Sequence, residues 1–229
     1  MASQNNTRKN INAQKAFWIA VAASICLPFI PYLRLLLLPF DFLNTHFHEM
    51  FHAIAAIGTG GQVGSIRVFS NAEGVTQTAG GLGPVISMAG YLGASLLGAF
   101  IVRTSHNQSN SRNWLKALGI VMFVAQVIWV RGDAVGWIFG LLWGAILLIS
   151  SAMLNSQWVL LAAQFVGIQQ CLNSLKSLRD LVILSNSNAQ TDAHAMQNFT
   201  HLPALFWALV WLLVGGFGVI LAAFTLHKE

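Results

Sequence analysis

The stretch "THFHEMFHAIAAIG", residues 45–58, places three histidines and one glutamate among Phe, Met, Ile and Ala. Ionisable groups are costly in apolar surroundings, and inside a membrane they usually serve a function. Three of them, His48, Glu49 and His52, form the pattern H-E-x-x-H. The question is why this apolar segment contains these three groups, and their spacing suggests an answer.

A helix gives the H-E-x-x-H spacing a chemical meaning. Positions four apart share one helix face, so His48 and His52 can bring two imidazoles to one zinc ion. Glu49 is turned away by about 100° and reaches a water molecule on the ion rather than the ion itself. Zinc lowers the pKa of such a water, and a carboxylate then accepts its proton during attack on a carbonyl carbon. We predict that His48 and His52 bind Zn²⁺ and that Glu49 is the general base, whereas His46 lies off this stripe and is predicted to be a packing or interfacial histidine.

The composition indicates a membrane protein. The chain has 229 residues, of which 55% are hydrophobic and 8% charged, and its mean hydropathy is +0.63. A soluble domain has about 25% charged residues, so this chain has too few to cover a water-exposed surface. The net charge is +5, but the basic residues form no stripe with interleaved aromatic residues, which argues against nucleic-acid binding. Cys26 and Cys171 both lie in apolar segments and define neither a disulfide framework nor a cysteine metal site.

Seven apolar segments follow one another along the chain. They are residues 16–38 (broken by Pro28, Pro31 and Arg34), 40–57, 82–102, 114–130, 134–149, a segment that begins at 158, and 202–226. Backbone groups in lipid must be satisfied within their own segment, which favours helices. We therefore predict an all-α integral membrane helical bundle of about six to seven membrane helices, with residues 16–38 as a retained first span rather than a cleaved signal peptide.

Two regions between these segments are polar. Residues 60–81 begin and end with glycine and contain the alternating run "VGSIRVFS", the turn "SNAEG" and the run "VTQT", which predict a small β-hairpin at the membrane boundary. Residues 185–200 read as a polar loop leading into a helix, with Thr191 or Asp192 as its N-cap. The expected organisation is a polar basic tail (1–15), a single membrane domain (16–226) and a short tail (227–229). Within the domain we distinguish a zinc helix (41–58), the hairpin (60–81) and a third-ligand region (185–200).

A catalytic zinc site normally has three protein ligands and one open position, so one ligand must come from elsewhere in the chain. The candidates in helical or near-membrane segments are Asp133, Asp180, Asp192, His194 and His201. Each has a simpler interpretation: Asp133 can pair with a nearby arginine, Asp180 can be a solvated charge, and Asp192 can be an N-cap alone. The residues by themselves leave this choice open.

Three stretches together resemble a known family. "HFHEMFHAIAAIGTGGQVGSIRV" (46–68), "AGYLGASLLG" (89–98) and "TDAHAMQNFTHLPALFWALVW" (191–211) look like the M50 family of site-2 protease-like membrane zinc metallopeptidases, especially its M50B-like branch. The resemblance implies a zinc metalloendopeptidase that hydrolyses peptide bonds within or at the edge of the membrane. It also implies that a late aspartate completes the zinc site. Asp192 is the best positional match and Asp180 the second choice, although this chain has Thr-Asp-Ala where the family has Leu-Asp-Gly.

The resemblance also suggests partners and a location. It implies membrane protein substrates, a lipid bilayer environment, a regulatory membrane partner and a multi-pass protein of a bacterial-type plasma membrane. An exposed strand edge at residues 62–70 is predicted to hold an unwound substrate by strand addition, with a plain connector as the alternative. Tyr91, Asn173 and Gln170 remain open as groups that stabilise the oxyanion.

Other functions and the orientation also remain open at this level. The first alternative function is a non-proteolytic membrane protein that keeps a metal-binding fold as a scaffold or sensor. The second is a transporter, which predicts ionisable groups in several spans or inverted repeats, neither of which the sequence shows. An N-terminus on the inside suits the basic residues of the tail, Arg8, Lys9 and Lys15. Counting the predicted spans then places Arg103, Arg112 and Lys116 outside, against the positive-inside tendency.

Overall fold

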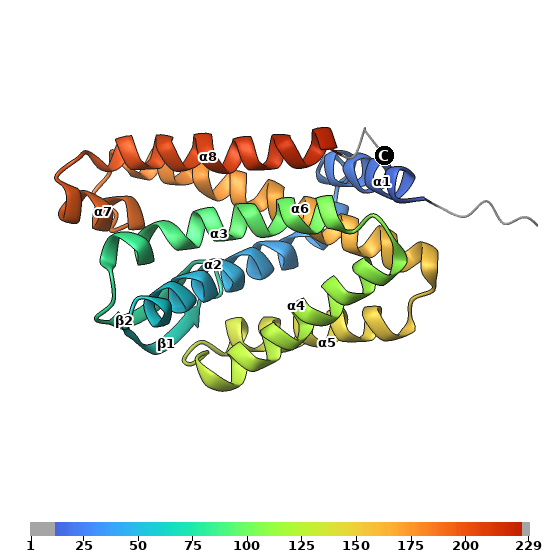
Figure 1. The fold of residues 1–229 in the computed structure, drawn as a ribbon, viewed down its shortest axis with the longest axis horizontal. Coiled ribbons are helices and arrows are strands. Elements are labelled where there is room, and N and C mark those ends of the chain that lie inside the picture. Colours follow the sequence, from blue (N-terminus) through green and yellow to red (C-terminus); the bar gives the residue numbers. More distant parts are fainter. Residues whose placement is uncertain (1–11, 226–229) are drawn as a thin grey trace, which may run out of the picture.

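A computed structural model describes residues 12–225 of the chain (Figure 1). Most of the predicted N-terminal tail and the whole C-terminal tail lie outside these residues. The helices are α1 (Ala13–Cys26), α2 (Leu38–Gly58), α3 (Gly83–Thr104), α4 (Gln108–Ile128), α5 (Ala134–Met153), α6 (Ser156–Leu184), α7 (Asp192–Thr200) and α8 (Ala204–Thr225); the strands are β1 (Gln62–Val68) and β2 (Gly74–Ala79). The predicted helical fold and the predicted hairpin after the H-E-x-x-H helix are both confirmed.

Three of the described helices are long and apolar enough to cross a membrane. They are α3, α5 and the stretch Ala204–Phe224 of α8. The helices α1 and α7 are shorter, and the other long helices carry polar groups that lower their hydropathy. α2 contains the H-E-x-x-H group, α4 starts with several polar residues, and the last turns of α6 contain Lys176, Arg179 and Asp180. These findings indicate a membrane protein, while the count of about six to seven membrane helices stays a prediction.

The predicted first span is interrupted at its prolines. The helix α1 has 14 residues, and two short 3₁₀ helices follow, η1 (Leu27–Phe29) and η2 (Leu33–Leu37). Pro28 lies in the first of these, because a proline cannot donate the backbone hydrogen bond that would continue the α-helix. A helix of 14 residues is about 21 Å long and falls short of a bilayer core of about 30 Å. Residues 16–38 therefore do not form the single spanning helix that the sequence predicted.

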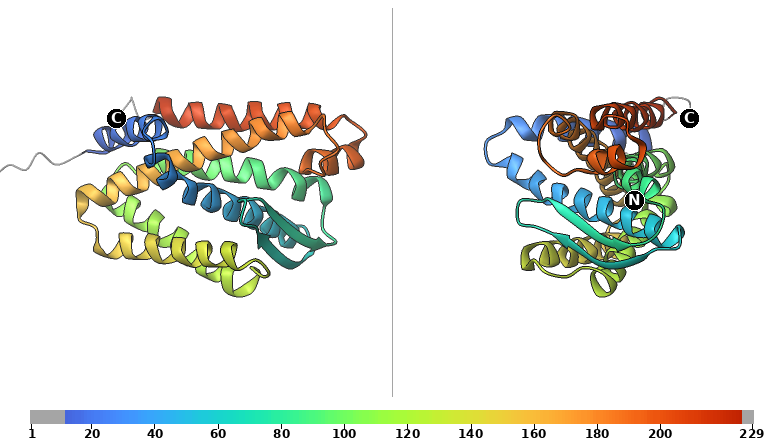
Figure 2. Two further views of the ribbon diagram at one scale, coloured as in Figure 1. Left: turned by 180° about the vertical axis from the view of Figure 1, so that it is seen from behind. Right: turned by 90° about the vertical axis from the view of Figure 1, so that its left-hand side faces the viewer.

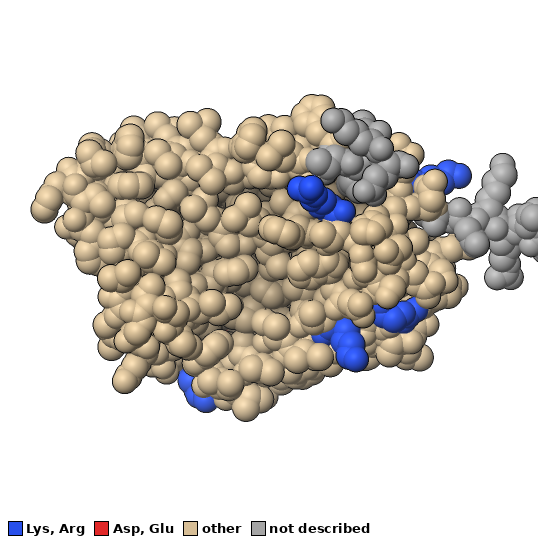
Figure 3. Space-filling view, viewed as in Figure 1, with Lys and Arg blue, Asp and Glu red and all other residues tan. Residues whose placement is uncertain are grey.

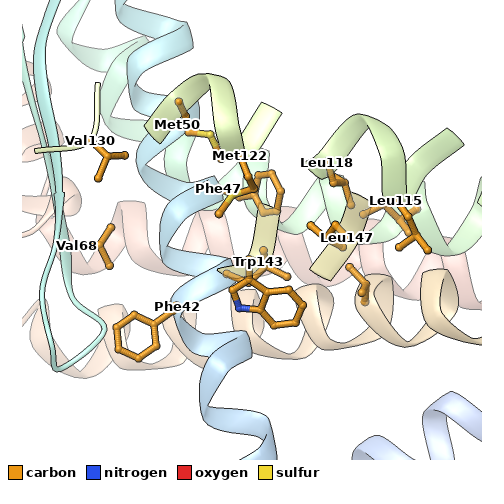
Figure 4. Close-up of a cluster of buried hydrophobic side chains, with 14 of the residues drawn as sticks. Phe42, Phe47, Met50, Val68, Leu115, Leu118, Met122, Val130, Trp143 and Leu147 are labelled. Atoms are coloured by element: carbon orange, nitrogen blue, oxygen red, sulfur yellow. The ribbon is translucent and has the colours of Figure 1, made fainter. Parts of the chain in front are cut away.

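The helix α2 crosses the middle of the bundle and has two different faces. Its apolar side chains Phe42, Phe47 and Met50 are buried against Met122 of α4 and Trp143 of α5 (Figure 4). Burial of a large apolar side chain contributes about 1.5–3 kcal/mol, so this cluster fixes how α2 is rotated. The polar face of α2 consequently turns away from α4 and α5.

The hairpin packs on the C-terminal half of α2. Its strands are antiparallel, with Ile66 opposite Thr76. On its other edge β1 contacts the α4–α5 connection: the Ile66 amide donates to the Trp129 carbonyl (2.8 Å), and the Arg131 amide donates to the Ile66 carbonyl (2.9 Å). The prediction that residues 62–70 present a free edge is therefore wrong at Ile66. The outer edge of β2 is the other edge of this two-stranded sheet. Within residues 12–225, no further strand pairs with it.

Several basic residues lie at one end of the bundle. The N-terminal end of α1 and the α3–α4 connection lie at the same end of the bundle, both in Figure 1 and in the left view of Figure 2. Lys15 belongs to the first turn of α1, Arg103 to the last turn of α3, and Arg112 and Lys116 to the N-terminal half of α4. Figure 3 shows basic side chains around this end on the face that it displays. These residues therefore lie at the same end of the bundle, whereas counting the predicted spans had placed Lys15 on the opposite side from the other three.

Candidate metal centre

His48 and His52 lie one turn apart on the polar face of α2. The helix begins with a proline in its first turn and has Asp41 there, both of which favour a helix N-terminus. The two Nε2 atoms are 2.9 Å apart. The Nδ1 atom of His52 is 2.6 Å from the Ile86 carbonyl on α3 and donates to it. This hydrogen bond fixes the tautomer of His52 and leaves the lone pair of Nε2 for a metal ion.

Asp192 joins this pair from 144 positions away in the chain. It is the first residue of α7, which packs beside the start of α3 (Figure 1). Its Oδ2 atom lies 3.3 Å from His48 Nε2 and 3.2 Å from His52 Nε2. Thr191 is the N-cap residue of α7, so the Asp192 side chain is not needed for that position.

The three ligand atoms fit a zinc ion. Tetrahedral zinc with bonds of about 2.0–2.1 Å places its ligand atoms roughly 3.3–3.4 Å apart. The two distances from the Asp192 oxygen to the imidazole nitrogens match this edge length, and the His48–His52 distance is slightly shorter. Two neutral imidazoles and one carboxylate are also the kind of donor set that catalytic zinc sites use. These residues would therefore hold a zinc ion and leave a fourth position for a reactant.

The ionisation of Asp192 suits this role. Burial by itself raises the pKa of the Asp192 carboxyl, but the facing His52 and His48 imidazoles, in their protonated form, outweigh it and hold that pKa below its usual range. With neutral imidazoles, a bound metal ion would supply the positive charge instead. The carboxyl therefore stays ionised at neutral pH, as a metal ligand must.

Gly90 of α3 lies directly beside the two imidazoles. A Cβ atom at Gly90 would lie 2.5 Å from His52 Nε2 and 2.6 Å from His48 Nε2. Gly98, two turns later, meets α6 instead, because a Cβ there would lie 2.7 Å from the Cys171 amide nitrogen. Gly90, Ala94 and Gly98 recur every four residues, and by sequence alone such a face of small residues is typical of close helix packing. That interpretation suits Gly98, whereas Gly90 keeps side-chain atoms out of the space next to the ligands.

Gly90→Ala is expected to weaken zinc binding by about tenfold or more, since the added methyl group must displace the imidazoles. The matched control is Gly93→Ala on the same helix, whose methyl group would press on the Phe51 ring rather than on a ligand. Zinc affinity, measured by competition with a chromogenic chelator, checks the prediction. Equal zinc affinities for the two variants would show that Gly90 matters only for packing.

Glu49 lies beside the metal ligands and is covered by β2. Its side chain is 4% exposed, and the Thr76 hydroxyl donates a 2.6 Å hydrogen bond to its Oε2 atom. A Cβ atom at Gly74 would lie 2.5 Å from Glu49 Oε1, so the strand touches the carboxylate directly. No sequence signal predicted Thr76, because threonine is common in strands.

The other candidates for the third ligand lie in different surroundings. Asp133 is the N-cap of α5 and accepts hydrogen bonds from two backbone amides there. Asp180 forms a 2.7 Å ion pair with its neighbour Arg179. His194 contacts the Thr191 hydroxyl, and His201 ends α7 in an exposed left-handed conformation. Among the described residues only Asp192 joins His48 and His52 in a group that can hold a metal ion.

His46 and the three oxyanion candidates, Tyr91, Asn173 and Gln170, lie in different surroundings. His46 is fully buried, and its Nδ1 atom donates to the Phe42 carbonyl in its own helix, as expected for a packing histidine. The Tyr91 ring meets the His48 ring edge-on, with centroids 4.5 Å apart. Gln170 instead donates to Asn44, one turn before His48. Asn173 of α6 is half-buried, and among the described residues its Nδ2 atom has no hydrogen-bond partner. Tyr91 is therefore the candidate whose contact with a candidate metal ligand the structure shows.

One of three comparisons with known proteins identifies a family for this chain. No curated protein and no solved structure matched the chain. The family model described as Peptidase M50B-like matches residues 17–223, a range that contains the H-E-x-x-H helix, the hairpin and Asp192. The chain therefore belongs to the Peptidase M50B-like family, as the sequence resemblance predicted.

Proposed function

We propose that this protein is a membrane zinc endopeptidase that hydrolyses peptide bonds of membrane proteins. Membership of a peptidase family supports the reaction type. The observation that carries the proposal is the convergence of His48, His52 and Asp192 next to a buried glutamate. A metal-binding protein without hydrolytic activity would need the three ligands but would not need Glu49.

The residues divide the chemistry between them. When bound, a zinc ion supplies Lewis acidity that activates water and polarises a peptide carbonyl. The Nε2 atoms of His48 and His52 and the Oδ2 atom of Asp192 would hold that ion in place. Glu49 accepts a proton from the attacking water and passes it to the leaving amide nitrogen. The burial of Glu49 under β2 limits competing contact with bulk water.

The substrate is proposed to bind along β2. A membrane helix keeps its backbone hydrogen bonds internal and must unwind before hydrolysis. An unwound segment can pair with the open edge of β2, next to Glu49. This assignment moves the predicted strand addition from residues 62–70 to Gly74–Ala79. The proposal retains a regulatory membrane partner and a multi-pass location in a bacterial-type plasma membrane, which rest on the family resemblance.

Metal removal tests this proposal. Purified full-length protein in detergent micelles is expected to cleave an internally quenched Leu/Ala-rich peptide of transmembrane length. Treatment with 1,10-phenanthroline should abolish cleavage, and stoichiometric Zn²⁺ should restore it, whereas Mg²⁺ should not, because imidazole ligands suit zinc and magnesium prefers oxygen ligands. Cleavage that survives complete metal removal contradicts the proposal. Zinc-loaded protein that leaves the peptide intact favours the scaffold or sensor alternative.

A further inference from the structure

The strand β2 makes an unusually direct contact with the proposed general base. The Thr76 Oγ1 atom lies 2.6 Å from Glu49 Oε2 and 3.0 Å from the Glu49 carbonyl oxygen. A threonine hydroxyl has one proton, so it donates to only one of these acceptors at a time. The shorter distance is typical of a charge-assisted hydrogen bond to a carboxylate. The carboxylate is therefore the acceptor, which fixes one of its two oxygens.

The backbone around Thr76 is itself held in place. The Thr45 hydroxyl of α2 donates a 2.6 Å hydrogen bond to the Ala72 carbonyl in the hairpin turn. Gly74 packs against Glu49 so closely that no side chain fits there. In the sheet, Thr76 is opposite Ile66, which is fully buried. The hydroxyl thus comes from a strand fixed to α2 and to the core, rather than from a loose loop.

We propose that Thr76 is a positioning residue that holds the Glu49 carboxylate in one orientation beside the metal ligands. The inference rests on the proposed role of Glu49 as general base. A glutamate side chain has several rotatable bonds, and ordering it during each reaction cycle would cost free energy. The hydrogen bond from Thr76 orders one oxygen in advance and leaves the remaining lone pairs free to accept a proton from water.

Thr76→Val tests the inference because valine keeps the shape of threonine and lacks the hydroxyl. We expect kcat for the quenched Leu/Ala-rich peptide to fall about tenfold to a hundredfold, as for loss of a hydrogen bond to a charged group. KM should stay within about twofold and zinc content should be unchanged, since Thr76 contacts neither the ligands nor the open edge through its side chain. Thr76→Ser should restore kcat. The matched control is Thr104→Val, which removes a threonine hydroxyl from the last turn of α3, at the opposite end of this helix from Gly90.

A spectroscopic measurement examines the same contact without any cleavage. The chain contains three glutamates, Glu49, Glu73 and Glu229. In a Glu73→Gln, Glu229→Gln background, ¹³C-labelled glutamate therefore reports on Glu49 alone. Isotope-edited infrared spectra of the zinc-loaded protein should show a shifted carboxyl band in Thr76→Val. The band should be unshifted in Thr76→Ser and Thr104→Val.

The two measurements separate this inference from the proposed function. A Thr76→Val protein with parental kcat and an unshifted band overturns the inference and leaves the proposed peptidase intact. Loss of zinc from Thr76→Val overturns it as well, because the residue would then support the fold of the site. If the parent protein cleaves no peptide, the proposed function fails. The infrared comparison still decides the inference: a shifted Glu49 carboxyl band in Thr76→Val supports it, and an unshifted band overturns it.

Discussion

Glu49→Gln is expected to abolish peptide cleavage while leaving zinc in place. Glutamine has almost the same shape as glutamate and can still accept the Thr76 hydrogen bond through its amide oxygen. It cannot take a proton from water, and general-base catalysis typically contributes about 10²–10⁴-fold to the rate. We therefore expect kcat to fall within this range while the zinc content stays at the parental level, measured on one preparation by peptide cleavage and by elemental analysis.

The control for this change is Glu73→Gln, the same substitution at an exposed position in the hairpin turn. It should leave both cleavage and zinc content at the parental level. Cleavage by Glu49→Gln at the parental rate would remove Glu49 from the mechanism. Loss of zinc from this variant would instead mean that Glu49 supports the metal site.

Asp192→Ala is expected to weaken zinc binding by more than about a hundredfold. Loss of residues that only support metal ligands already costs about 10–100-fold in affinity, and Asp192 supplies a ligand atom itself. Its removal also leaves the two Nε2 atoms of His48 and His52 without the carboxylate that they face. Cleavage should fall in proportion to bound zinc, and excess zinc should recover part of it.

The matched control is Asp180→Ala, which removes the aspartate that is the second candidate for the third ligand. Asp180 pairs with Arg179 at an exposed site, so its loss should leave zinc affinity unchanged. Titration of both variants against a chelator of known affinity gives the comparison. Zinc affinity that is unchanged in Asp192→Ala and lowered in Asp180→Ala would reverse the assignment of the third ligand.

The parts of the site that sequence predicted are the local ones. Helical periodicity alone places His48 and His52 on one face, because their spacing matches one turn. The hairpin followed from alternating residues between glycines. The helix α2 spans Leu38–Gly58, close to the predicted segment at 40–57, because its apolar pattern and its proline mark the start.

The remaining features depend on contacts between distant segments. The approach of Asp192 to His48 comes from the packing of α7 on α3, and the sequence alone left it among five candidates. Thr76 reaches Glu49 only because the hairpin folds back over α2. Gly90 looked like a packing glycine because its neighbours recur every four residues, and only the fold shows which side chains it faces.

The most direct test of the metal centre is the zinc X-ray absorption spectrum of the purified parent protein. We predict two imidazole nitrogens and one carboxylate oxygen among the zinc ligands at about 2.0–2.2 Å, with the imidazole signal retained and the zinc occupancy reduced in Asp192→Ala. A sulfur ligand at about 2.3 Å, which only a cysteine such as Cys26 or Cys171 or a methionine could supply, would contradict the assignment, and so would a spectrum without two imidazoles.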